Sequence, residues 1–154
     1  MRLLDGRKKF AIMLDYQFGR GASRALPRDG LRFYYSRRSA RLKQVTHRGK
    51  LFATIRPNGA IALSLYSASL LIASKAFLRN SVTVRDETAD FVREGKSVFC
   101  KFVVRAGKHV LSGAEVVVLD ERGTPLGVGR AKVPGPYMGE FNAGVAVKVR
   151  SAHQ

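Results

Sequence analysis

Residues Glu94–Val104 read EGKSVFCKFVV, a stretch that combines a glycine, two lysines and a hydrophobic run. Asp86 begins the preceding segment DETADFVREG and is a suitable N-cap for a short helix. Gly95 supplies the left-handed residue with which such a helix commonly ends. We therefore predict a helix that ends at Gly95 and continues directly into a strand, with Lys96 and Lys101 turned outward toward an anion.

The rest of the second half alternates like a series of strands. SVTV predicts a strand before the helix, and EVVVLD, PLGVGRAKV and GVAVKVR predict three after it. One face of the strand after Gly95 is expected to carry Val98, Cys100, Phe102 and Val104. PGPYMGEFNAG predicts a turn, a helix of one or two turns and a glycine cap. This order favours a small β-barrel with two short helices.

The first half contains the strongest hairpin signal, LFATIRPNGAIALSLY at residues 51–66. Asn58 and Gly59 can adopt the positive φ angles of a two-residue turn. The alternation pairs the inner-facing residues Leu51, Ala53 and Ile55 with Ile61, Leu63 and Leu65. Together with LRFYYS this predicts a β-meander, followed by a short helix SASLLIAS with Ser67 as a candidate N-cap.

The opening segment KKFAIMLDYQFGRGASRAL is read as an apolar run and then a short helix that ends near Leu26. Arg20, Arg24 and Arg28 recur every four residues and would share one face of a helix there. A solvated face is the simpler explanation of this arginine spacing.

Charge is the unusual property of the composition. The chain of 154 residues carries 28 Lys and Arg against 11 Asp and Glu, a net charge of +17. Residues 1–80 hold 17 of the basic and 3 of the acidic residues. Such a surplus favours a polyanionic partner, and its asymmetry indicates two units with different roles. We place the domains at residues 1–76 and 77–154.

Several function classes are disfavoured. A single cysteine, Cys100, excludes an internal disulfide, and with three scattered histidines it leaves no ordinary zinc site. GRGAS lacks the glycine spacing of a phosphate-binding loop, and no paired carboxylates or Ser–His–Asp arrangement stand out. We expect no catalysis, no cofactor, and for Cys100 a buried, unreactive side chain.

The chain is expected to be soluble and cytoplasmic. The stretch MRLLDGRKKFAIML lacks the long apolar core and small-residue cleavage site of a secretion signal. Residues 57–74 carry no charge, but serines, Asn58, Gly59 and Tyr66 interrupt them, so a membrane span is not expected.

The second half resembles the PUA domain, the RNA-binding module named after pseudouridine synthases and archaeosine transglycosylases. The strand and acidic helix, GKSVF, VVVLD, GVGRA and GVAVKVR follow the order of that family over about residues 78–151. Ala114 departs from the pattern, because the family usually has an aspartate there. The resemblance implies a barrel-like fold and RNA binding.

The first half, with DYQFG, GAS and LFATIRPNGAIALSL, resembles the small domain that precedes the PUA domain in archaeal tRNA-guanine transglycosylases and archaeosine synthases. The chain has no room for their catalytic barrel and lacks the cysteines and histidine of its zinc site. The resemblance therefore implies the RNA-binding part of these enzymes without their chemistry, within an α+β architecture.

Carried over from the PUA family, the RNA surface lies along the helix-to-strand turn and the last strand. These residues are Gly95, Lys96, Ser97, Val98, Phe99, Lys148 and Arg150. We add Lys101 to the RNA-binding residues, because the strand pattern turns it outward. Phe99 could stack on a terminal base or pack against protein, and Lys96 could instead complement the helix dipole. In the first half the densest basic set contains Arg37, Arg38, Arg41 and Lys43, which suit phosphate contacts.

We expect a two-part clamp on structured RNA, with the tRNA acceptor stem and 3′ end as the first candidate. Two alternatives stay open: a non-catalytic subunit of a separately encoded transglycosylase or archaeosine synthase, and a ribosome-associated basic protein. DNA binding is disfavoured, because neither helix expected in the second half is long and basic enough to read a groove.

Overall fold

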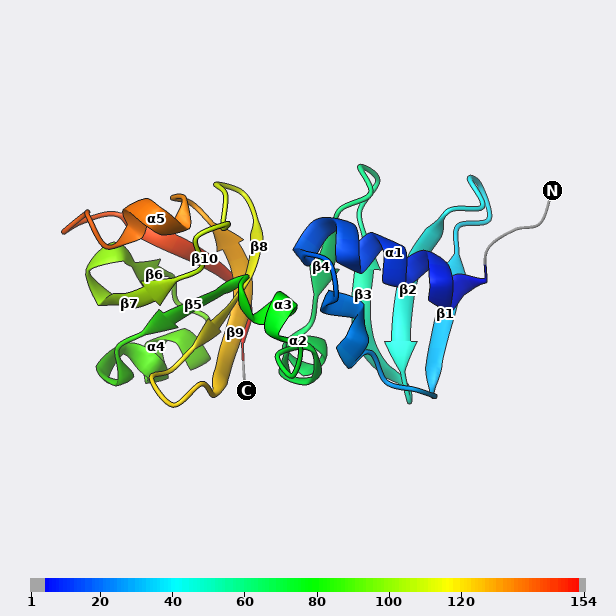
Figure 1. Ribbon diagram of the computed structural model, residues 1–154, viewed down its shortest axis with the longest axis horizontal. Helices are drawn as coiled ribbons and strands as arrows, with labels where there is room; N and C mark the ends of the chain where they lie inside the picture. Colours follow the sequence, from blue (N-terminus) through cyan, green and yellow to red (C-terminus); the bar gives the residue numbers. More distant parts are fainter. Residues whose placement is uncertain (1–4, 153–154) are drawn as a thin grey trace. The chain divides into compact units, whose positions relative to one another are not determined.

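The computed structural model describes residues 5–152. The chain forms two compact units, one that ends at Phe77 and one that begins at Leu78. Both combine helices and strands, which confirms the predicted α+β class (Figure 1). Among the described residues, no helix has the length and apolar character needed to cross a membrane.

The first unit is a four-stranded antiparallel meander with a helix across it (Figure 1). Its elements are α1 (Gly6–Phe18), η1 (Ala22–Ala25), β1 (Leu31–Tyr35), β2 (Leu42–His47), β3 (Lys50–Ile55), β4 (Ile61–Leu63), α2 (Leu65–Leu71) and α3 (Lys75–Leu78), whose last residue is already the first of the second unit. The strands lie in chain order, so the predicted meander is confirmed.

Helix α1 holds this unit together. Phe10, Leu14 and Phe18, each four residues from the next, form its buried stripe. Phe10 packs edge-to-face against Phe33 of β1 and Phe52 of β3, with ring centroids 6.3 and 6.1 Å apart. The sequence interpretation took this segment only as an apolar run and began the helix after Gly21, where the structure has one short 3₁₀ turn. Arg20, Arg24 and Arg28 therefore do not share a helix.

The hairpin register is confirmed in its centre and wrong at its ends. Ala53 pairs with Leu63, and Ile55 pairs with Ile61. Leu51 is 46% exposed, because the register between β2 and β3 shifts and sends its neighbour Phe52 into the core instead. Leu65 belongs to α2 and not to a strand.

The N-cap of α2 is Ser64, not Ser67. The backbone N–H of Ser67 donates to the Ser64 hydroxyl oxygen at 3.1 Å, and the backbone N–H of Ser64 donates to the Ser67 hydroxyl oxygen at 3.1 Å. The two serines thus form a capping box, in which the predicted cap is the N3 partner.

The second unit is a six-stranded, nearly closed sheet of order β6-β10-β9-β8-β5-β7. Its elements are β5 (Ser81–Val84), η2 (Asp86–Thr88), α4 (Ala89–Arg93), β6 (Val98–Phe99), η3 (Cys100–Phe102), β7 (Val103–Ala106), β8 (Glu115–Leu119), β9 (Pro125–Ala131), α5 (Gly135–Met138) and β10 (Val145–Ala152). The pair β5–β8 is parallel and the other pairs are antiparallel.

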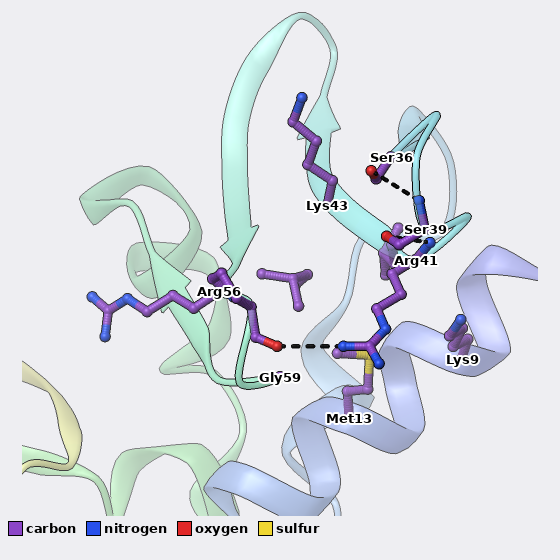
Figure 2. A pocket seen from close by; sticks show the side chains of 11 residues that line it. Lys9, Met13, Ser36, Ser39, Arg41, Lys43, Arg56 and Gly59 are labelled. Atoms are coloured by element: carbon purple, nitrogen blue, oxygen red, sulfur yellow. Dashed lines mark hydrogen bonds between the residues drawn. The ribbon is translucent and has the colours of Figure 1, made fainter.

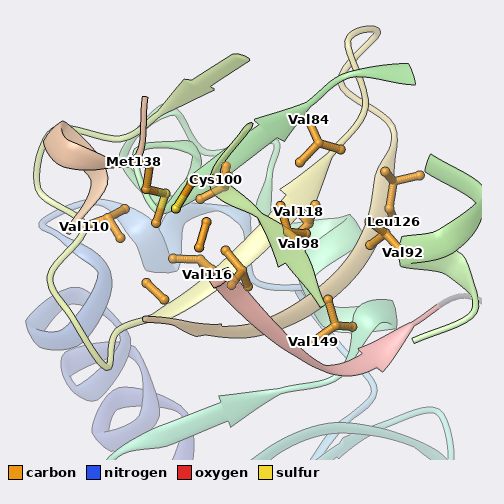
Figure 3. Packing of buried hydrophobic residues seen from close by; sticks show 14 of the residues in the cluster. Val84, Val92, Val98, Cys100, Val110, Val116, Val118, Leu126, Met138 and Val149 are labelled. Atoms are coloured by element: carbon orange, nitrogen blue, oxygen red, sulfur yellow. The ribbon is translucent and has the colours of Figure 1, made fainter. Parts of the chain in front are cut away.

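Small β-branched side chains fill the interior of this sheet (Figure 3). Val84, Val98 and Val118 are fully buried, and helix α4 adds Val92. The strands approach closely where glycine replaces a side chain. A Cβ at Gly129 of β9 would overlap the backbone of the neighbouring strand β10.

Two local predictions in the second unit are wrong. Asp86 does not cap the helix: its carboxylate accepts the backbone N–H of Glu121 at 3.0 Å, and the Glu121 carboxylate accepts the backbone N–H of Asp86 at 3.1 Å. The strand after Gly95 stops at Phe99, where the 3₁₀ turn η3 begins. This turn changes the phase of the alternation, so Val103 packs against the core and Val104 is exposed.

Candidate nucleic-acid interface

A glycine opens the corner between α4 and β6, as predicted. Gly95 has a φ of +88°, its N–H donates to the Val92 carbonyl oxygen at 2.9 Å, and the Lys96 N–H donates to the Phe91 carbonyl oxygen at 3.0 Å. This pair of bonds is the Schellman motif, which ends a helix sharply. Because the space around Gly95 is open, a ligand can approach the backbone there.

Lys96 projects from this corner into solvent. Its Nζ lies 3.2 Å from Oε2 of Glu94 and 4.9 Å from the centre of the Phe91 ring. Both charged side chains are more than half exposed, so their ion pair contributes little and an anionic ligand can displace it. Phe91, also exposed, was not among the predicted residues.

The three residues after Lys96 face different environments. Val98 is buried in the core, so only its backbone can reach a ligand. Ser97 is half-buried, and the Phe99 side chain is 45% exposed on the strand that pairs with β10. Phe99 therefore presents ring surface to solvent, next to the glycine-opened turn.

The remaining cations of the second unit divide into exposed and neutralised groups. Lys101 in η3 is exposed, with its Nζ 5.0 Å from the centre of the Phe102 ring, and Lys148 on β10 is exposed as well. Arg150 instead forms a bidentate ion pair with Glu115, with N–O distances of 2.5 and 2.6 Å. The Glu115 side chain is only 5% exposed and the Arg150 side chain is 33% exposed, so the carboxylate is buried and the arginine reaches it from the surface.

Cys100 faces the core below the corner. Burial raises the pKa of its thiol, which keeps the sulfur protonated and unreactive at neutral pH. Within residues 5–152, no group of three or more His, Cys, Asp and Glu residues is arranged to hold a metal ion.

In the first unit, the loop between β1 and β2 presents the predicted arginines. Arg37 and Arg38 are exposed at its turn. Two backbone hydrogen bonds of 2.8 Å close the loop, from Ser36 N–H to the Arg41 carbonyl and from Ala40 N–H to the Ser36 carbonyl. Ala40 adopts a left-handed φ of +58° to make this turn. The loop therefore holds Arg41 in a defined place.

Arg41 and Lys43 border a pocket of about 650 Å³ between α1, the β1–β2 loop and the β3–β4 turn (Figure 2). Its lining consists of Lys9, Met13, Ser36, Ser39, Arg41, Leu42, Lys43, Ile55, Arg56, Pro57 and Gly59. Four of these side chains are cationic and none is a carboxylate. The pocket is thus basic at its edge and apolar on its floor.

Comparison with known proteins assigns both units to families. The family model of the PUA domain matches residues 80–153. These residues form a PUA domain. A second model, the patch-forming domain C2 of tRNA-guanine transglycosylase, matches residues 8–77. We therefore call the unit that begins at Leu78 the PUA domain and the unit that ends at Phe77 the C2 domain.

The order of these domains is that of the C-terminal part of archaeal tRNA-guanine transglycosylases, to which the chain is homologous. It is 34% identical over 141 residues to tRNA-guanine(15) transglycosylase of Thermoplasma acidophilum, covering 92% of this chain and 22% of that enzyme. The Thermococcus kodakarensis enzyme is 34% identical over 147 residues, covering 95% of this chain and 25% of the enzyme. The chain thus spans about a quarter or less of the length of these relatives.

Two solved structures share the fold over nearly the whole chain. A hypothetical protein from Pyrococcus horikoshii has a TM-score of 0.72 at 24% identity, covering 95% of this chain and 89% of its own. A conserved PUA domain protein from Thermoplasma acidophilum has a TM-score of 0.68 at 18% identity, covering 96% and 88%.

The predicted site residues thus fall into two groups. Gly95, Lys96 and Phe99 are exposed together at the corner of the PUA domain, whereas Arg41 and Lys43 border the pocket of the C2 domain. Sequence reasoning missed Lys9 and Met13 of the pocket. Their four-residue spacing places them on one face of α1 and could have identified them, had the helix been predicted.

Proposed function

We propose that the chain binds structured RNA through the corner of the PUA domain, with the tRNA acceptor stem and its 3′ end as the ligand. The observation that carries this proposal is the glycine-opened turn, where accessible backbone adjoins the half-exposed ring of Phe99 and the exposed Lys96. Backbone amides and Ser97 can bond a phosphate or a base edge, and Phe99 can stack on an unpaired terminal base. Homology to tRNA-guanine(15) transglycosylases supports tRNA as the RNA.

The C2 domain supplies the electrostatic attraction in this proposal. Residues 1–80 hold 17 basic and 3 acidic residues, and Arg37 and Arg38 project from an exposed loop. Such phosphate contacts are tolerant of sequence and sensitive to salt, so they position the RNA. Arg150, engaged by Glu115, has a structural role and not a binding one.

The proposed activity is binding without chemistry. The aligned part of the relatives is about 22% of their length, so a second arrangement is an RNA-binding subunit of a separately encoded transglycosylase or archaeosine synthase. Affinity capture from a native extract separates the two. Recovery of RNA without a catalytic subunit supports an independent binder. Recovery of a catalytic subunit that stays bound after nuclease treatment supports the adaptor.

Charge reversal tests the corner directly. The double variant Lys96→Glu, Lys148→Glu should weaken tRNA binding by more than tenfold while the unfolding transition stays in place. The matched control Lys108→Glu, Arg122→Glu makes the same charge change at two other exposed residues of the PUA domain.

Two results would overturn the proposal. If both double variants lose affinity equally, the effect belongs to net charge and the corner has no special role. If wild-type protein binds duplex DNA as tightly as tRNA at the same salt concentration, the corner does not select RNA.

A further inference from the structure

The pocket of the C2 domain combines an apolar wall with a basic edge. Its apolar wall comes from Met13 of α1, Leu42 of β2 and Ile55 of β3. Leu42 is buried, and the other two side chains are half-buried, so part of their surface stays accessible in the pocket. This wall offers contact to a flat apolar group.

Arg41 extends over the same space. Its Nη1 lies 3.5 Å from the Pro57 carbonyl oxygen, and Figure 2 draws its guanidinium close to the Met13 thioether. A guanidinium plane stacks well on an aromatic base and keeps donors for an anion at its edge. Thioether sulfur also makes favourable contacts with aromatic rings.

No carboxylate of the described residues neutralises the cations that Lys9, Arg41 and Lys43 contribute to the lining of the pocket. The carboxylates of residues 5–152 form no ion pair with any of these three side chains within 4.0 Å. Arg56 also belongs to the lining, but its guanidinium points away in Figure 2. The Lys43 ammonium of β2 also points away from Met13 in Figure 2, so an anion attached to the flat group would meet cations from α1 and the loop.

We infer that this pocket binds one unpaired nucleotide of an RNA, with the base on the Met13–Arg41 wall and the phosphate at the basic edge. The volume of about 650 Å³ lies within the range of about 300–1,000 Å³ typical of small-ligand sites, so it accommodates a nucleotide and not a stacked duplex. A free mononucleotide has the same chemistry. The assignment to RNA rests on the proposed function and adds a second contact, distinct from the PUA corner.

An RNA hairpin with one bulged uridine and the same hairpin fully paired, both without a single-stranded tail, test this inference with the full chain. The bulged form should bind about tenfold more tightly. Arg41→Ala should remove that advantage, whereas Arg20→Ala, which removes an exposed arginine outside the pocket, should keep it.

Crosslinking supplies a readout that does not depend on a variant folding correctly. A 4-thiouridine placed in the bulge should crosslink to peptides that contain Met13 or Arg41. Equal affinity for the two hairpins, or crosslinks confined to the PUA domain, would overturn the inference while RNA binding itself stood.

If neither hairpin binds, the affinity for tRNA, which carries the 3′ tail, decides about the proposed function, and a titration with uridine 5′-monophosphate followed by amide chemical shifts decides about the pocket. Shifts confined to the pocket lining would overturn the assignment to RNA and assign the site to a free mononucleotide. The absence of shifts would overturn the site altogether.

Discussion

The C2 and PUA domains use their acidic residues differently. In the C2 domain, Asp5 accepts the Lys8 N–H at 2.9 Å and Asp15 accepts the Ser23 N–H at 2.9 Å, so both serve the backbone. Among the residues that the structure describes, the carboxylate of this domain that pairs with a cation is the exposed Asp29, which lies 3.4 Å from Arg48. The carboxylates of the C2 domain thus neutralise little of the positive charge of its cations.

In the PUA domain, carboxylates both build the fold and neutralise cations. Asp120 accepts the backbone N–H groups of Arg122 and Thr124 at 2.9 and 2.8 Å, which closes the turn between β8 and β9. The ion pairs are Arg85–Glu87, Arg93–Asp90, Lys96–Glu94 and Arg150–Glu115. This difference fits the proposed function, in which the excess charge of the C2 domain attracts the RNA and the shape and exposed groups of the PUA corner select it.

The largest stability effect is expected at the ion pair between Arg150 and the buried Glu115 of the PUA domain. Arg150→Ala leaves the Glu115 carboxylate buried without its guanidinium partner, which should cost about 3–5 kcal/mol of unfolding free energy. Hydrogen exchange resolved by peptide should show lost protection in the PUA domain alone. Arg85→Ala, which removes an exposed pair of 3.9 Å, is the control and should change stability by less than about 1 kcal/mol.

A somewhat smaller effect should follow from adding one methyl group between strands. Gly129→Ala places a Cβ against the Lys148 backbone and should separate β9 from β10, at a cost of about 1–3 kcal/mol. Gly139→Ala, where the added Cβ meets open space, should leave the urea midpoint nearly unchanged. Equal midpoints for the two variants would contradict the close strand packing.

The C2 domain offers the corresponding test at a hydrogen-bonded side chain. The Gln17 amide donates to the Ile61 carbonyl at 3.0 Å and accepts the Ile61 N–H at 2.7 Å, which ties α1 to β4. Gln17→Ala should cost about 1–2 kcal/mol and reduce exchange protection in the C2 domain only. Tyr16→Ala removes a side chain that is 93% exposed and serves as the neighbouring control.

Sequence reasoning succeeded where local chemistry decides the structure. Gly95 ends α4 because only the residues beside it determine that motif, and Asn58-Gly59 set the turn between β3 and β4 in the same way. Helix α1 had such signals too, with Asp5 as N-cap and Gly19 after its end, but its buried stripe was mistaken for an unstructured apolar run.

Local sequence patterns could not predict contacts between residues that are far apart in the chain. At the start of η3 the Cys100 N–H donates to the Gly144 carbonyl at 2.9 Å, a bond between residues that are far apart in the chain. Arg150 and Glu115 lie 35 residues apart on strands separated by β9. Their ion pair depends on the order of the strands in the sheet, which the sequence pattern around Arg150 does not contain. The pocket likewise required the placement of α1 on the meander.

The salt dependence of tRNA binding tests the division of labour between the domains most directly. The variant Arg37→Ala, Arg38→Ala, Arg41→Ala, Lys43→Ala should lower the slope of log affinity against log salt by about 3–4, since each lost phosphate contact removes about 0.7–0.9. Its preference for tRNA over duplex DNA should persist, because the PUA corner is intact. An unchanged slope, or a lowered slope accompanied by a lost preference for tRNA, would contradict the account.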